Sequence, residues 1–266
     1  MSFDNKTIVV TGASSGIGAA CVALLKRRGA KVIGMDINEP AASSVDQFVA
    51  FNQGSLDSID QAVEKLPSGI DALFNIAGVA PSPRFSAVDV LKINFFGLRY
   101  FTEKMIDKLK DGAAIVNMSS GTGTGWPTNI ENIKAFLALN NIDDVEGFVA
   151  DHGIGNDGLD NSAAYPFSKQ LLSVWTMKVS SRWKDRGIRV NAVAPAAVDT
   201  PIMGDFLNSF GEESKQRVEK FGAATPENIA LASVFLASED AIWVNGAVLP
   251  VDGGAVTGGM MLKMGI

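Results

Sequence analysis

The sequence predicts an α/β fold in which helices cover both faces of one doubly wound parallel sheet. Two observations predict it. Short β-rich runs alternate with longer helical patterns along most of the chain, and the first run, 7–10, is continuous in β-branched residues, as a strand buried on both faces should be. Because neither an internal repeat nor a low-complexity linker interrupts the alternation, we expect a single domain over 1–266.

The order of the elements follows from these patterns. Strands are expected at 7–10, 31–35, 48–51, 71–75, 113–118, 188–193 and 248–251. Helices are expected at 17–28, 57–66, 87–109, 163–183 and 226–236, the last with a proline in its first turn. Repeated strand–helix units of this kind give parallel pairing.

One segment, 121–161, breaks the alternation. It is too long for an ordinary connection between a strand and a helix. It contains a plausible helix at 130–139 and then a loop at 151–161 that is rich in Gly, Asp and Asn. We therefore expect a mostly helical insertion between the fifth strand and the helix at 163–183.

Composition excludes several classes of protein. With 47% hydrophobic and 20% charged residues, the chain can bury a sizeable core. The formal net charge of -6 argues against a nucleic-acid partner. Cys21 is the single cysteine, so no intrachain disulfide can form, and we expect it to be packed as a small hydrophobic side chain. No Cys/His cluster suggests a metal, and no signal peptide or membrane helix is evident, so a cytoplasmic location is expected.

A glycine-rich turn joins the first strand to the first helix. It contains the small residues that allow close backbone approach to a pyrophosphate, beside the positive end of a helix dipole. The context of strand, turn and helix is the one that a dinucleotide site requires, and it indicates a Rossmann-type domain. The residues that we expect to bind the cofactor here are Gly12, Ser14, Ser15, Gly16, Ile17 and Gly18.

An acidic residue, Asp36, ends the second expected strand. A carboxylate at this point can accept hydrogen bonds from both hydroxyls of the adenosine ribose, and it would repel a 2′-phosphate. Neither Arg nor Lys lies beside it or in the glycine-rich turn. The sequence therefore favours NAD over NADP.

Tyr165 and Lys169 lie four residues apart in a predicted helix, so both project from one face. An ammonium beside a phenol favours the phenolate and should lower the pKa of the tyrosine. A tyrosine tuned in this way can move a proton to or from an alcohol near neutral pH. The spacing alone is a weak signal, because chance matches are common.

Several further elements occur in the order typical of one family. They are the glycine-rich turn, Asp36, the run from Asn75 to Gly78 after the fourth strand, Asn94, the pair Ser119-Ser120 after the fifth strand, and Tyr165 with Lys169. Together they closely resemble the short-chain dehydrogenase/reductase family, from Lys6 to about Gly254. The resemblance implies an NAD-dependent short-chain alcohol dehydrogenase.

The resemblance also implies a role for each catalytic residue. Tyr165 would exchange the proton on the substrate oxygen, and Lys169 would lower the pKa of Tyr165 and bind the nicotinamide ribose. Ser120 would hydrogen-bond the substrate oxygen. Asn94 would hold a water molecule in a proton relay behind Lys169.

Further contacts to the cofactor are implied in the same way. The residues concerned are Ser55, Leu56, Asn75, Ala77, Gly78, Pro195, Val198 and Thr200. The chain departs from the family pattern twice. Ala196 stands where a glycine is usual, and Ser55 stands where an aspartate often contacts the adenine amino group, which would weaken the grip on adenine.

The insertion separates Ser120 from Tyr165 in the chain, which is similar to a branch of the family. That branch contains bacterial 3α-hydroxysteroid dehydrogenase/carbonyl reductases and coniferyl-alcohol dehydrogenases, and it implies a bulky hydrophobic alcohol or carbonyl substrate. The candidate substrate residues are Trp126 on the insertion and Met203, Phe206 and Leu207 on a lid expected at 200–222.

Some alternatives stay open. Phe136 and Phe148 could line a substrate pocket or form the core of the insertion, and His152 is expected to be a solvated loop residue. An NADPH-linked carbonyl reductase and a non-catalytic NAD-binding regulatory protein are competing hypotheses. Since the insertion could cover a helical surface through which relatives associate, we expect a homodimer or a rearranged homotetramer.

Overall fold

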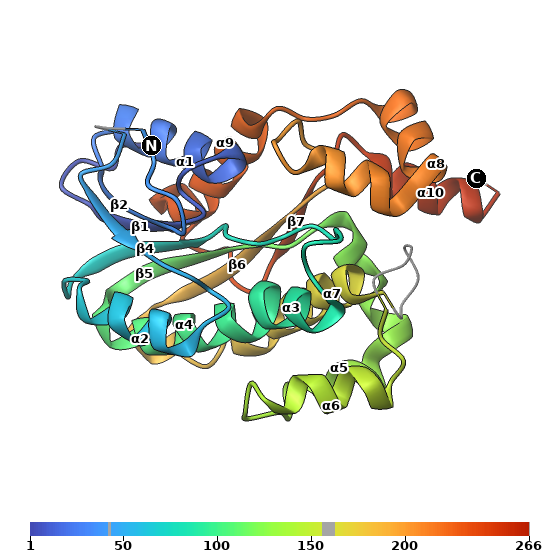
Figure 1. The fold of residues 1–266 in the computed structure, drawn as a ribbon. Coiled ribbons are helices and arrows are strands. Elements are labelled where there is room, and N and C mark those ends of the chain that lie inside the picture. Colours follow the sequence, from blue (N-terminus) through green and yellow to red (C-terminus); the bar gives the residue numbers. More distant parts are fainter. Residues whose placement is uncertain (42–43, 156–162, 266) are drawn as a thin grey trace.

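The computed structural model describes residues 1–41, 44–155 and 163–265. Within these residues, seven strands form one sheet in which every neighbouring pair is parallel (Figure 1). Their order across the sheet is β3 (Gln47–Ala50), β2 (Lys31–Asp36), β1 (Thr7–Thr11), β4 (Ile70–Asn75), β5 (Leu109–Met118), β6 (Arg189–Pro195) and β7 (Val248–Val251). The predicted fold class is confirmed.

Helices cover both faces of the sheet (Figure 1). The helices α1 (Gly16–Arg27) and α9 (Pro226–Ala237) bury their apolar sides in one core layer. The opposite layer contains α2 (Leu56–Glu64), α3 (Ala87–Leu91), α4 (Leu98–Met105) and α7 (Ala164–Val179). The strands between the layers are apolar almost throughout, and every residue of β6 is buried.

The sequence sets several helix starts through side-chain caps. Ser86 and Asp89 form a reciprocal capping box at the start of α3, and Thr225 and Asn228 form another at the start of α9. Ser55 caps α2 by accepting a hydrogen bond from the Ser58 N–H at 3.3 Å. These caps explain why the expected helices begin where they do.

The topology reverses between β1 and β4. From β1 the chain moves outward to β2 and β3, and then crosses to the other side of β1 to form β4. The loops that follow these two strands diverge at the carboxyl edge of the sheet, which is where open α/β sheets bind their ligands. The site described below lies at this edge.

The long helix expected at 87–109 is interrupted, and this prediction was wrong in detail. A π-helical segment, Lys92–Gly97, separates α3 from α4, and a short 3₁₀ turn follows α4. Leu109 begins β5 instead of ending the helix. Similarly, α7 ends at Val179, earlier than expected.

The insertion is helical, as expected, but it contributes to the core. It contains a 3₁₀ helix, Gly121–Asn129, followed by α5 (Ile130–Leu137) and the unexpected α6 (Asp144–Asp151). Phe136 and Phe148 pack edge to face, with ring centroids 5.0 Å apart, and Phe136 also meets Phe95 of the main domain. These two rings therefore belong to the core. Of the loop expected at 151–161, residues 156–161 lie outside the described residues.

Two single residues behave as expected. Cys21 is fully buried in α1, and burial raises the pKa of its thiol to about 12, so it is an inert packed side chain. His152 is exposed at the end of α6, where its ring stacks on Phe148 with 3.9 Å between centroids.

Besides α9, two further α-helices follow β6 in the described part of the chain. The helix α8 (Met203–Phe221) occupies most of the expected lid, and α10 (Ala255–Lys263), which the sequence reading missed, ends the described chain. Two glycines inside α10 disfavour a helix on propensity alone. None of the helices in the described parts of the chain is long and apolar enough to span a bilayer.

Candidate active site

A cavity of about 1250 Å³ opens at the carboxyl edge of the sheet. It is large enough for a dinucleotide together with a second small molecule. The predicted site residues that line it are Gly12, Ser15, Gly16, Ile17, Gly18, Asp36, Ala77, Gly78, Ser120, Tyr165, Lys169, Pro195, Val198, Thr200, Met203, Phe206 and Leu207. The structure thus brings residues from the whole length of the chain to one surface.

The glycine-rich turn forms one wall through close backbone contacts. Gly12 has a φ of +70°, and a Cβ added to it would lie 2.9 Å from the backbone nitrogen of Ala77. A Cβ on Gly16 would meet the Thr200 side chain at 3.2 Å. Ser15, the residue before α1, makes no side-chain cap, so the first N–H groups of the helix stay available to an anion.

The Asp36 carboxylate is fixed at the rim of this wall. It accepts hydrogen bonds from the backbone N–H of Ser14 at 3.0 Å and of Asn38 at 3.1 Å. Each bond uses one carboxylate oxygen, and a carboxylate has further acceptor positions for a ribose diol. The open helix end, the close glycine turn and this carboxylate together fit a nicotinamide dinucleotide.

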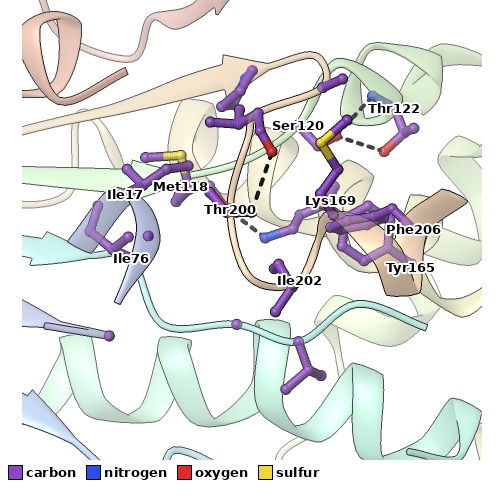
Figure 2. Close-up of a pocket in the computed structure, with 18 of the residues that line it drawn as sticks. Ile17, Ile76, Met118, Ser120, Thr122, Tyr165, Lys169, Thr200, Ile202 and Phe206 are labelled. Carbon is purple, nitrogen blue, oxygen red and sulfur yellow. Dashed lines mark hydrogen bonds between the residues drawn. The ribbon is translucent and has the colours of Figure 1, made fainter. Parts of the chain in front are cut away.

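The expected catalytic trio lies deeper in the cavity (Figure 2). Tyr165 and Lys169 project from the first turns of α7, and Ser120 follows β5. The Lys169 ammonium donates to the Met118 carbonyl at 2.8 Å and lies 5.6 Å from the centre of the Tyr165 ring. Ser120 lies close enough to Tyr165 for its side chain to lower the pKa of the phenol.

Burial has the largest effect on the pKa values of both Tyr165 and Lys169. It raises the pKa of Tyr165 to about 12, and the polar Ser120 side chain offsets only part of that rise. Burial also lowers the pKa of Lys169 to about 8. Any effect of Lys169 on the pKa of Tyr165 is outweighed by this burial, because both side chains are almost fully enclosed.

Asn94 lies behind the trio and is completely buried. It belongs to the π-helical segment, a distortion that often occurs at functional sites. Its side-chain amide donates to the Val79 carbonyl at 2.9 Å and accepts from the Val79 N–H at 2.8 Å. Asn94 therefore fixes the loop after β4, next to Gly78, but does not itself line the cavity.

The lid segment, 200–222, closes the other wall. The Phe206 ring packs edge to face on Tyr165 with 4.8 Å between centroids (Figure 2). The Phe210 ring lies 6.0 Å from the same tyrosine ring. Arg84, which lines the cavity, forms an ion pair with Asp205 of α8. The Ser209 hydroxyl donates to the Pro81 carbonyl at 2.8 Å.

Comparisons with known proteins agree with this geometry. Residues 6–130 match the family model described as short chain dehydrogenase, and residues 152–256 match the one described as enoyl-(acyl carrier protein) reductase. The chain is 34% identical to a coniferyl-alcohol dehydrogenase from a Pseudomonas species, with 96% of this chain and 98% of the relative covered. The chain belongs to the short-chain dehydrogenase/reductase family.

Other members support the same assignment. A 3-alpha-hydroxysteroid dehydrogenase/carbonyl reductase of Comamonas testosteroni is 28% identical, covering 93% of this chain and 95% of the relative. The crystal structure of the 3-alpha-hydroxysteroid dehydrogenase from Pseudomonas sp. B-0831 complexed with NADH has a TM-score of 0.81 and 26% identity, covering 97% of this chain and 98% of the neighbour. The chain is thus an oxidoreductase of a family that uses a nicotinamide cofactor.

Several residues carried over from the family pattern do not line the cavity. The Ser14 hydroxyl donates a hydrogen bond to the Asn38 carbonyl, and the Ser55 hydroxyl caps α2. Leu56 packs against the core, as does Trp126 of the insertion. For these four residues, a position near the site in sequence did not bring the side chain into the cavity.

Asn75 is also a structural residue. It is fully buried, and its amide donates to Asn117 at 2.8 Å and to Thr102 at 2.9 Å, which ties β4 to β5 and α4. Only the residues that follow it, from Ile76 onward, reach the cavity.

The sequence reading missed other cavity residues. Asn52 and Gln53 line the cavity shortly after β3, three and two residues before Ser55. The rule that ligands bind beyond the carboxyl ends of parallel strands would have identified both residues. Thr122 and Phe210 also line the cavity, and neither lies in a recognisable motif.

Proposed function

We propose that this chain is an NAD-dependent alcohol dehydrogenase that interconverts a bulky hydrophobic alcohol and its ketone or aldehyde. The observation that carries the proposal is the position of the Ser120 and Tyr165 hydroxyls and the Lys169 ammonium on one cavity whose lid wall is apolar. Met203, Phe206 and Leu207 supply much of that wall, which suits a large hydrophobic substrate.

The chain's residues would act on the substrate oxygen. In oxidation, Tyr165 would accept the hydroxyl proton of the alcohol, and in reduction it would return that proton to the carbonyl oxygen. Ser120 would donate a hydrogen bond to the same oxygen as its charge develops. The nicotinamide ring, when bound, supplies the hydride acceptor or donor.

Lys169 and the lid would adjust the acidity of Tyr165. Phe206 and Phe210 pack on the phenol ring, and their displacement by a substrate would remove part of the burial that raises its pKa. The Lys169 ammonium would then stabilise the phenolate through space. Val198 and Thr200, on the loop after β6, would fix the nicotinamide end of the cofactor.

The preference for NAD rests on Asp36. Its two backbone hydrogen bonds hold a negative charge where the adenosine ribose would lie, and a 2′-phosphate would be repelled there. The neighbour with a TM-score of 0.81 was crystallised with NADH, which supports the same preference. Faster reduction of a carbonyl with NADPH than with NADH would favour the competing carbonyl reductase.

The proposal is tested by NADH formation with the purified full chain. The substrates are cinnamyl-type alcohols, 3α-hydroxysteroids and cyclic terpenoid alcohols, and Tyr165→Phe is assayed beside Tyr100→Phe. Tyr100 bonds to Asp60 outside the cavity, so its variant should stay active. We expect Tyr165→Phe to lose about 10²- to 10⁴-fold in kcat. Tight NAD binding without turnover of any substrate would instead favour a non-catalytic role.

We also propose a cytoplasmic homodimer or homotetramer. The insertion packs α5 against α7 and α6 against α3, so it covers part of the helical surface that those elements would otherwise present. The single cysteine suits a reducing compartment. Light scattering at the monomer mass would contradict the assembly.

A further inference from the structure

The Ser120 hydroxyl receives two hydrogen bonds from one residue, Thr122. The Thr122 backbone N–H donates to Ser120 Oγ at 3.3 Å, and the Thr122 hydroxyl donates to the same oxygen at 3.2 Å (Figure 2). A serine hydroxyl has two acceptor positions and one proton. With both acceptor positions occupied, the proton of Ser120 must point elsewhere.

Tyr165 lines the same cavity as Ser120, and the Ser120 side chain acts to lower the pKa of its phenol. Because the Ser120 oxygen already accepts twice from Thr122, its own proton is left for an acceptor in the cavity, which is the Tyr165 oxygen or a substrate oxygen. Donation therefore runs from Thr122 to Ser120 and onward into the cavity. In such hydrogen-bond chains each bond polarises the next and strengthens it.

The contact made by Thr122 differs from that of its neighbours in the same 3₁₀ helix. Thr124 donates its hydroxyl to the Gly121 carbonyl at 2.7 Å, and Thr128 donates to the Gly125 carbonyl at 3.0 Å. Both follow the ordinary pattern of a threonine that bonds to a backbone carbonyl three residues earlier. The Thr122 hydroxyl instead donates its hydrogen bond to Ser120, a side chain of the expected catalytic trio.

We propose that Thr122 is a positioning residue, whose hydroxyl commits the Ser120 proton to the reacting oxygen. Without that hydroxyl, Ser120 regains a free acceptor position and can rotate its proton away from Tyr165 and from a substrate oxygen. Thr122 acts through Ser120 and not by holding the substrate. This inference rests on the proposed dehydrogenase activity.

The test compares Thr122→Val, which keeps the shape but loses the hydroxyl, with Thr122→Ser, which restores it. Thr128→Val removes a hydroxyl from the same helix, outside the cavity, and serves as the matched control. We expect Thr122→Val to lower kcat about tenfold, as one lost hydrogen bond would, with KM for the alcohol changed less than about twofold. Thr122→Ser should recover most of the rate.

A second measurement needs neither cofactor nor turnover. The chain has two tyrosines, so labelling the tyrosine Cζ with ¹³C should give two resonances, and Tyr100→Phe identifies the one from Tyr165. We expect Thr122→Val to shift the Tyr165 resonance and to leave that of Tyr100 in place. Thr128→Val should shift neither resonance.

The outcomes separate this inference from the proposed function. An unchanged Tyr165 resonance with an unchanged kcat in Thr122→Val would overturn the inference while leaving the dehydrogenase intact. A rise in KM alone would overturn it as well, because Thr122 would then be a substrate contact. If the wild-type chain turned over no alcohol, the proposed function would fail, yet a shifted resonance would still support the hydrogen-bond chain.

Discussion

The two walls of the cavity are built in different ways. The wall formed by the glycine-rich turn and the loop after β4 is held by backbone contacts so close that a single added methyl group would collide with them. The opposite wall is α8, in which none of the described side chains is fully buried. Gly211, at a φ of 63° and a ψ of -151°, also breaks the helical geometry inside α8.

This difference indicates which wall can move. Elements with few buried contacts open at a small cost in free energy, whereas buried backbone contacts open only with the domain. The lid is attached mainly through Phe206 and Phe210 on Tyr165, the Arg84–Asp205 ion pair and the Ser209 hydroxyl. A rigid wall for the cofactor and a detachable wall for the substrate therefore meet at the expected catalytic residues.

The largest effect is expected at the rigid wall, in Gly12→Ala. The change adds a Cβ that collides with Ala77 in a left-handed backbone conformation, and we expect it to cost about 2 kcal/mol or more in NAD binding, or about 30-fold in Kd. Gly112→Ala is the matched control, because Gly112 has a φ of +79° and an added Cβ meets nothing within 4 Å.

Calorimetric titration with NAD and thermal melting of both variants make the comparison. Gly112→Ala should lose only the stability of a strained backbone, about 1 kcal/mol, and should bind NAD as the wild type does. Equal Kd values for the two variants would show that the wall tolerates a methyl group. The contrast between the walls would then be lost.

The next largest effect is expected at Lys169, whose almost fully buried side chain should make stability depend on pH. Its pKa is about 8 in the folded chain and 10.5 when solvated, so between these values the unfolded state binds more protons and stability rises with pH. We expect a gain of about 2 kcal/mol in the free energy of unfolding between pH 8 and 9.5. Tyr165, with a pKa raised to about 12, acts in the opposite direction only above pH 10.

Urea unfolding of the wild type and of Lys169→Met at pH 7.5 and 9.5 measures this effect. The variant lacks the buried ammonium, so it should not show the gain. If both proteins changed equally with pH, Lys169 would be solvated in the folded chain.

The fold and the cofactor wall could be predicted because they depend on local patterns. Each strand end and each glycine in the turn leaves a signal in the sequence that requires no knowledge of distant packing. Asp36 and Tyr165 were found in the same way. The errors arose where tertiary contacts decide the outcome. Asn75 was drawn into a buried amide network, and the π-helical distortion around Asn94 leaves no periodic signal.

The lid wall and the titration of the site were harder to predict for the same reason. Phe206 was identified from its position in the lid, but its contact with Tyr165 depends on how a weakly held helix folds back across the cavity. The direction of the Tyr165 pKa shift depends on that enclosure. The sequence pattern identified the neighbouring Lys169, but it could not reveal the burial that has the largest effect on the pKa of Tyr165.

The smallest effect is expected at the detachable wall, in Arg84→Met. The ion pair with Asp205 is largely exposed on the Arg84 side, so it should contribute less than about 1 kcal/mol to stability. Its removal should nevertheless change KM for a bulky alcohol or kcat by about two- to threefold, because the pair ties the lid helix α8 to Arg84 on the cavity wall. Added salt should reproduce the effect in the wild type.

The matched control is Arg182→Met, which removes a similar exposed pair with Glu103 of α4, outside the cavity. Steady-state kinetics at low and high salt, with Asp205→Asn as the reciprocal variant, complete the comparison. Arg84→Met and Asp205→Asn should give the same change and should not add when combined, while Arg182→Met should leave the kinetics unaltered. Additive changes, or an equal response in Arg182→Met, would mean that the pair does not hold the lid. The mobility of that wall would then have to depend on the two phenylalanines that cover Tyr165.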